Sequence, residues 1–140
     1  MTKNGPVIVI EDDEDDRFLF KEVFERLNYP NKIIFFPDGL AALNFLTTTD
    51  IRPFLILSDI NMPKLNGIEL HRKLKMDAAL NLKCIPYLFF STSVDQQAVI
   101  NSYSISVQGF FLKQDKIEGL EKIISSIMNY WYRCATPNNF

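Results

Sequence analysis

The amino-acid sequence predicts an α/β fold in which a parallel sheet carries helices on both faces. Short runs rich in β-branched and aromatic residues alternate with longer stretches of helical period, and this alternation is typical of the class. Most of the short runs are apolar throughout, as strands buried on both faces should be. The 140 residues are 47% hydrophobic and 23% charged, which suits one packed domain that needs no disulfide or metal to hold it together.

The first half of the chain contains three predicted strands and two predicted helices. The five strands expected in the whole chain lie at residues 7–10, 32–36, 54–58, 87–90 and 109–112. The first helix has one apolar face, formed by Phe20, Val23, Phe24 and Leu27. Asp15 or Asp16 is expected to cap this helix, and Asp38 to cap the second helix, because a carboxylate accepts hydrogen bonds from unpaired N–H groups at a helix start.

The second half of the chain predicts three more helices. In the third, Leu70 and Leu74 face the core, and His71 is expected on the solvated surface. Ser93 and Gln96 have the spacing of a capping box that opens the fourth helix. The last helix has an apolar stripe, formed by Ile117, Leu120, Ile123, Ile124, Ile127, Met128 and Trp131. We expect a single domain over residues 1–140, with a core at about 6–133, a tail at 134–140 and no output domain.

Composition argues against several classes of partner. The net charge is −2, but the six residues from Glu11 to Asp16 are all acidic, so the acidity is local. Neither an extended basic face for nucleic acid nor an apolar run of the ~18 residues that span a bilayer is present. The sequence therefore predicts a cytoplasmic protein that binds neither nucleic acid nor membrane. Cys84 and Cys134, with one histidine in the chain, are expected to be free thiols.

Polar residues directly follow the predicted strands, at the edge where parallel α/β sheets bind ligands. They are Glu11 and Asp12 after the first strand, Asp59 and Asn61 after the third, Ser91 after the fourth and Lys113 after the fifth. Converging carboxylates repel one another unless a cation lies among them, and oxygen ligands favour Mg²⁺. A metal, an ammonium group and a hydroxyl together can each bind one phosphoryl oxygen. Phosphoryl transfer is the chemistry that uses all of these groups.

Four segments, IVIEDDEDD, LILSDINMPKLNG, FFSTS and GFFLK, occur in this order along the chain. In sequence and spacing they resemble the receiver domain of two-component response regulators, and the resemblance covers nearly the whole chain. It implies a flavodoxin-like (βα)5 fold with strand order 2-1-3-4-5. It also implies phosphorylation by a sensor histidine kinase or phosphotransfer protein, a downstream protein target and a phosphorylation-dependent homodimer as one form of output. Such a domain is not an enzyme, because it catalyses only its own phosphoryl transfer and autodephosphorylation.

The resemblance assigns a role to each residue of the strand-end group. Asp59 is the phospho-acceptor. Asp12 and the backbone carbonyl of Asn61 bind Mg²⁺ together with Asp59, and Glu11 holds a metal-bound water. The sequence thus implies Mg²⁺ as the cofactor.

The resemblance also implies how the phosphoryl group is held and how its presence is signalled. Ser91 donates a hydrogen bond to the phosphoryl group and Lys113 pairs with it. Phe110 is the aromatic residue that moves inward on activation. Gln114 departs from the usual pattern, in which a proline follows the lysine, and Phe110 stands where tyrosine is also common.

Two alternatives remain open at this point. One is a Mg²⁺-dependent phosphohydrolase with Asp59 as the covalent nucleophile. Enzymes of the haloacid-dehalogenase type, however, carry a second aspartate two residues after the nucleophile, and here that residue is Asn61. The other alternative is a pseudo-receiver that binds partners without being phosphorylated. Loss of the acceptor, the acidic pair or the lysine would favour it, and all of these are present.

Overall fold

The structure, a computed structural model, describes residues 5–92 and 96–135. One sheet of five parallel strands forms its centre, in the order β2-β1-β3-β4-β5. The strands are β1 (Val7–Ile10), β2 (Ile33–Phe36), β3 (Leu55–Asp59), β4 (Tyr87–Ser91) and β5 (Gly109–Leu112). The flavodoxin-like strand order expected from the sequence is confirmed, and predicted strand bounds differ from the observed ones by at most one residue.

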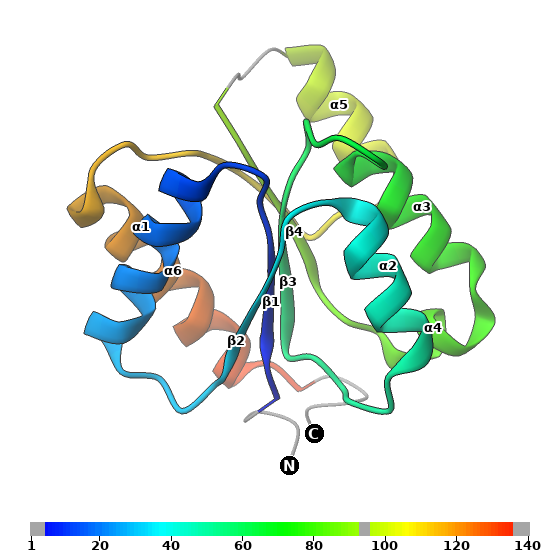
Figure 1. The fold of residues 1–140 in the computed structure, drawn as a ribbon, viewed down its shortest axis with the longest axis horizontal. Helices are drawn as coiled ribbons and strands as arrows, with labels where there is room; N and C mark the ends of the chain where they lie inside the picture. The colour runs from blue at the N-terminus through cyan, green and yellow to red at the C-terminus, as the bar shows by residue number, and fades with distance from the viewer. Residues whose placement is uncertain (1–4, 93–95, 136–140) are drawn as a thin grey trace.

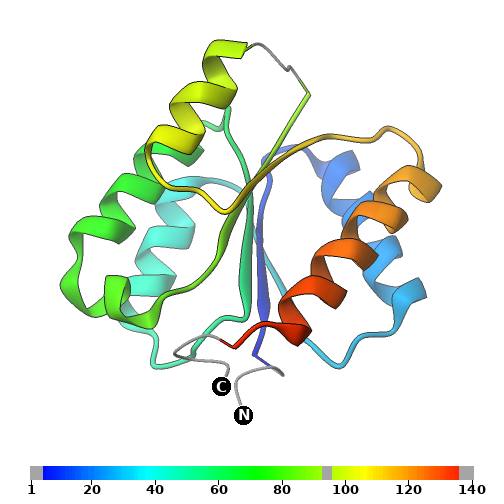
Figure 2. The ribbon, with the colours of Figure 1, turned by 180° about the vertical axis from the view of Figure 1, so that it is seen from behind.

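Helices cover both faces of the sheet (Figures 1 and 2). One face carries α1 (Glu14–Leu27) and α6 (Ile117–Arg133). The other carries α2 (Gly39–Thr48), α3 (Gly67–Met76), α4 (Ala78–Lys83) and α5 (Gln96–Ser104). The carboxyl ends of the strands meet at the end of the molecule opposite the two chain termini (Figure 1). The loops at that end therefore come from all five strands.

The two faces of the sheet have separate apolar cores. Val7 and Val9 of β1 pack with residues of α1 and α6, whereas Ile8 and Ile10 pack with residues of α2 and α3. All four side chains are at most 1% exposed, since successive residues of a strand point to opposite faces. This double burial explains why the strand sequences are apolar throughout instead of alternating.

The helix starts depend on side-chain caps, one of which the sequence predicts correctly. The Asp38 carboxylate accepts a hydrogen bond from the Ala41 N–H at 2.8 Å, as expected. The expected cap of α1 at Asp15 or Asp16 is wrong, because Asp13 accepts hydrogen bonds from the N–H groups of both residues. The chain turns into α1 directly after β1, which places Asp15 and Asp16 in the first helical turn.

An additional short helix separates α3 from β4. Asp77 ends α3 and caps α4 by accepting a hydrogen bond from the Leu80 N–H at 3.1 Å, so six helices are described instead of the five expected. The prediction that His71 is solvated is wrong, because its side chain is 5% exposed. Its ring packs edge-on against Tyr87, with centroids 4.8 Å apart. The added helix α4 packs beside α3 and contributes to covering this flank.

Several smaller expectations concern the ends of the chain and its surface. Ser93 lies outside the described residues, so its predicted capping role is not tested there. Cys84 and Cys134 are free, as predicted. Across residues 5–92 and 96–135, none of the helices combines the length and apolarity needed to cross a bilayer.

Candidate functional site

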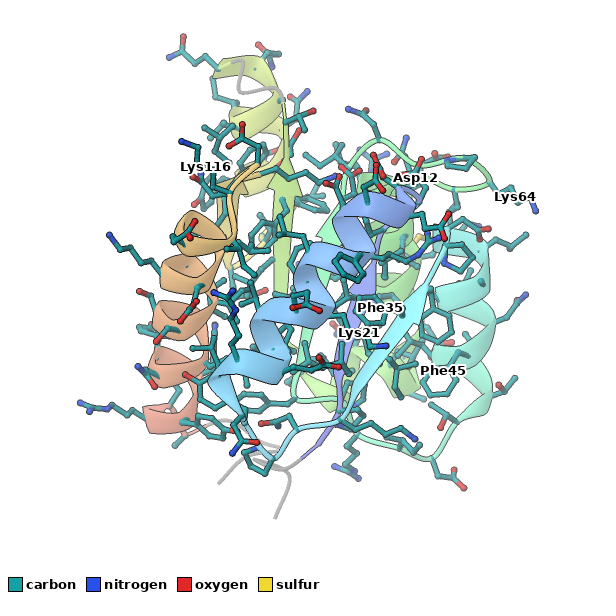
Figure 3. The ribbon with its side chains drawn as sticks, turned by 60° about the vertical axis from the view of Figure 1, so that its left-hand side comes forward. Asp12, Lys21, Phe35, Phe45, Lys64 and Lys116 are labelled. Atoms are coloured by element: carbon teal, nitrogen blue, oxygen red, sulfur yellow. The ribbon has the colours of Figure 1, made fainter. Side chains whose placement is uncertain are left out.

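The predicted site residues come together at the carboxyl end of the sheet. Ile10 is in register with Ser58, so Glu11 and Asp59 follow neighbouring positions of β1 and β3. Asp59 is in register with Phe90, and the following residue, Ser91, ends β4. Figure 3 shows Asp12 at this end of the molecule, together with Lys64 of the β3–α3 loop. The sheet register therefore gathers side chains that lie up to about one hundred residues apart in sequence.

The ammonium group of Lys113 lies among three carboxylates. Its Nζ atom is 2.7 Å from Glu11 Oε2, 3.0 Å from Asp59 Oδ2 and 3.0 Å from Asp16 Oδ2. The side chains of Lys113 and Asp59 are each 10% exposed, and that of Glu11 is 2% exposed. The backbone N–H of Lys113 donates a hydrogen bond to the Ser91 carbonyl at 2.8 Å, which fixes the lysine backbone. These contacts hold one positive charge beside the predicted acceptor.

Burial and charge together shift the pKa values of this group. Burial raises the pKa of Glu11 to about 7, with Asp59 adding to the rise and Lys113 opposing it. Burial also raises the pKa of Asp59, again opposed by Lys113. Burial alone would lower the pKa of Lys113, but the carboxylates around it raise it. The site therefore carries more negative charge than a single ammonium group can balance.

Three of the carboxylates fit a divalent cation. One ligand oxygen from each of Glu11, Asp12 and Asp59 lies within 4.8 Å of the others. Glu11 and Asp59 are buried and Asp12 is exposed, so the group opens to solvent on one side. Hard oxygen donors with room for water suit Mg²⁺ or a similar ion better than a soft metal. Asn61, which follows Asp59 by two residues, is exposed at the same strand end.

The backbone around Asp59 is tightly held. Asp59 Oδ1 accepts a hydrogen bond from the Ile60 N–H at 2.7 Å, and the Ile60 carbonyl accepts one from the Gly67 N–H at 2.8 Å. A Cβ atom added to Gly67 would lie 2.3 Å from the Asp59 carbonyl oxygen and 2.9 Å from the Phe89 ring. Only glycine permits this close approach of α3 to the acceptor strand.

The remaining predicted residues occupy β4, β5 and the loop that follows. Ser91 is buried, with 2% exposure. Phe110 is half-buried, and its ring centroid lies 6.4 Å from that of Phe89 in an edge-on arrangement. Gln114 donates a side-chain hydrogen bond to the Leu112 carbonyl at 3.1 Å. No cis peptide bond occurs in the described residues, which include the link between Lys113 and Gln114.

Two residues of the site were not predicted from the sequence. The sequence suggests Asp16 only as a possible cap of the first helix, yet it contacts Lys113. Arg17 donates a hydrogen bond to the Glu11 carbonyl at 2.7 Å. Asp16 lies in the first turn of α1, three residues after the Asp13 cap, and the position of this turn directly after β1 is the signal that could have placed Asp16 near the same strand end.

The chain resembles proteins of a known family in sequence. A family model of the response regulator receiver domain matches residues 7–125. The chain belongs to this family. This receiver domain is 32% identical over 135 residues to the response regulator Rcp1 of Synechocystis sp., and the matched residues cover 93% of this chain and 90% of the relative. It is 26% identical to the chemotaxis protein CheY-3 of Vibrio cholerae, covering 81% of this chain and 83% of the relative.

Solved structures of similar proteins share the fold of this receiver domain. The phosphorylated cyanobacterial phytochrome response regulator RcpA has a TM-score of 0.84 and 28% identity, covering 95% of this chain and 97% of that one. The Mn²⁺-bound form of Rcp1 has a TM-score of 0.80 and 31% identity, covering 94% of this chain and 97% of that one. The family resemblance and the (βα)5 sheet order expected from the sequence are confirmed.

Proposed function

We propose that this receiver domain is a response regulator switch in which Asp59 accepts a phosphoryl group from a histidine kinase or phosphotransfer protein. The observation that carries the proposal is the position of the Lys113 ammonium, 3.0 Å from Asp59 Oδ2 within an acidic group that fits a divalent cation. Asp59 belongs to this acidic group and ends β3, beside the strand that ends at Ser91.

The chemistry follows from the charges. A carboxylate is a weak nucleophile, and it must approach a phosphoryl group that also carries negative charge. Lys113 offsets this repulsion and opposes the rise that burial causes in the pKa of Asp59. One Asp59 oxygen forms a bond to phosphorus while the P–N bond of the donor phosphohistidine breaks, and the imidazole leaves with the electron pair. The backbone N–H of Ile60 holds the carboxylate in place, so the protein contributes position and charge.

A divalent cation fits the carboxylate group, and Mg²⁺ is the ion that we propose. Asp12, Asp59 and the backbone carbonyl of Asn61 would hold it, with Glu11 beside it. When bound, Mg²⁺ would supply positive charge that stabilises the phosphoryl oxygens. The structure of the similar protein Rcp1 is described as Mn²⁺-bound, which supports binding of a divalent ion.

The output is proposed to be a change in a protein-binding surface. Ser91, drawn toward the phosphoryl group, and Phe110, which moves into the vacated space, would connect the site to α5, β5 and α6. Exposed aromatic side chains lie on this surface, with Tyr103 52% and Tyr130 62% exposed, and such residues anchor interfaces well. A downstream protein or a second copy of the chain are the proposed partners. We also propose a cytoplasmic location, in agreement with the free cysteines.

Incubation with acetyl phosphate and Mg²⁺, followed by intact mass measurement, tests the proposal. The parent chain is expected to gain one phosphoryl group, and Asp59→Asn is expected to gain none because it lacks the nucleophilic carboxylate. Asp50→Asn, which removes an exposed acid beyond α2, is the matched control and is expected to be labelled like the parent. A labelled Asp59→Asn chain would refute the acceptor. Continuous release of phosphate without a labelled chain would instead favour a phosphohydrolase.

A further inference from the structure

The contact between Asp16 and Lys113 has no role in the proposed transfer step. We propose that Asp16 is a positioning residue that competes with the phosphoryl group for the Lys113 ammonium and thereby weakens the phosphorylated state. The inference rests on the proposed function, since it concerns how tightly the same site holds its phosphoryl group.

The three carboxylates occupy the full hydrogen-bonding capacity of Lys113. An ammonium group has three N–H donors. Three carboxylate oxygens, from Glu11, Asp16 and Asp59, lie 2.7 to 3.0 Å from Nζ. An incoming phosphoryl oxygen therefore gains a full hydrogen bond from Lys113 only when one of these carboxylates gives up its own.

Exposure and surroundings identify Asp16 as the carboxylate that exchanges. Its side chain is 32% exposed, against 2% for Glu11 and 10% for Asp59, so water solvates it readily after release. Glu11 and Asp59 belong to the group that fits a cation, and Asp16 does not. Asp59 also carries the phosphoryl group itself. The phosphoryl oxygen and the Asp16 carboxylate are thus alternative partners for one N–H of Lys113.

Removing the charge of Asp16 should strengthen phosphoryl binding. Asp16→Asn keeps the size of the side chain but competes weakly, because a neutral amide oxygen accepts a weaker hydrogen bond from an ammonium group than a carboxylate does. The loss of an ion pair of intermediate exposure changes an equilibrium constant by about three- to tenfold. Asp15→Asn is the matched control, since Asp15 lies in the same helical turn and is exposed, and the ion-pair partners described for Lys113 are Glu11, Asp16 and Asp59.

The experiment is a calorimetric titration of the folded full chain with beryllofluoride in saturating Mg²⁺, since beryllofluoride mimics the phosphoryl group without chemistry. Asp16→Asn is expected to bind it about three- to tenfold more tightly than the parent, and Asp15→Asn to change the affinity by less than about twofold. A separate titration with Mg²⁺ alone is expected to give the same affinity for both variants. Circular dichroism checks that both are folded.

The outcomes separate the two proposals. Beryllofluoride affinities that are equal in Asp16→Asn and Asp15→Asn, or weaker in Asp16→Asn, would overturn the competition alone. A gain in Mg²⁺ affinity in Asp16→Asn as large as the gain for beryllofluoride would also overturn it, because a rearranged metal site would then account for both. Absence of beryllofluoride binding by the parent would overturn the proposed function, and the competition with it.

Discussion

Lowering the pH should destabilise the fold through His71. The imidazole is 5% exposed and packs against Tyr87, and within residues 5–92 and 96–135 its buried Nδ1 atom has no hydrogen-bond partner. Burial, together with a smaller contribution from the nearby Lys75, lowers the pKa of His71 from an ordinary value of 6.5 to about 4. The folded state therefore favours the neutral ring, while the unfolded chain takes up a proton near pH 6.5.

The sign and size of the effect follow from these two pKa values. The stability that comes from a neutral His71 is fully present above pH 6.5 and is lost as the pH falls toward 4. The difference of about 2.5 units corresponds to about 3 kcal/mol in full. About 2 kcal/mol of this should be lost between pH 8 and pH 5, because the folded ring is still mostly neutral at pH 5.

Urea unfolding of the metal-free protein between pH 8 and pH 5, with and without His71→Phe, measures this contribution. Phenylalanine keeps a ring against Tyr87 but does not titrate, so the free energy of unfolding of the variant minus that of the parent should rise by about 2 kcal/mol over this range. Because the chain contains one histidine, its proton resonance reports the pKa directly. Parallel stability curves for the two proteins, or a ring that titrates near pH 6.5, would refute the reasoning.

Three further predictions concern the acidic site. Mg²⁺ at one hundred times its dissociation constant should stabilise the parent by about 2.7 kcal/mol in thermal melts. Asp12→Ala should lose most of this stabilisation. Without metal, the variant should be no less stable than the parent. Lys113→Met should lower the free energy of unfolding at pH 8 by about 3 to 5 kcal/mol in urea titrations, because it leaves carboxylates crowded without their cation; an unchanged midpoint would contradict this. The pKa of Glu11 is raised to about 7. In metal-free protein, Glu11 should therefore contribute stability that is present below pH 4.5 and lost as the pH rises through 7. Glu11→Gln should then be more stable than the parent at pH 8 but not at pH 4.

The sequence predicts the arrangement of strand ends well because topology determines it. Once five apolar strands run parallel, Glu11, Asp59, Ser91 and Lys113 must follow them at one edge of the sheet. Their order along the chain and their residue types then limit the chemistry. No detailed packing information is needed for this step.

What the sequence did not predict depends on helix rotation and on packing. Asp13 caps α1, so Asp16 lies in its first turn, where its carboxylate contacts Lys113. His71 is buried because its ring packs edge-on against Tyr87 of β4. The first outcome follows from where a helix begins, and a shift of two or three residues changes which side chains face inward.

The close approach of Gly67 to Asp59 limits how the chain can change at residue 67. The Asp59 carbonyl oxygen of β3 lies 2.3 Å from where a Cβ of residue 67 would lie, and the Phe89 ring of β4 lies 2.9 Å from it. The start of α3 therefore leaves no room for a side chain against either strand. A residue other than glycine at this position has to displace α3 or one of these two strands, and they are the strands whose ends position Asp59 and Ser91.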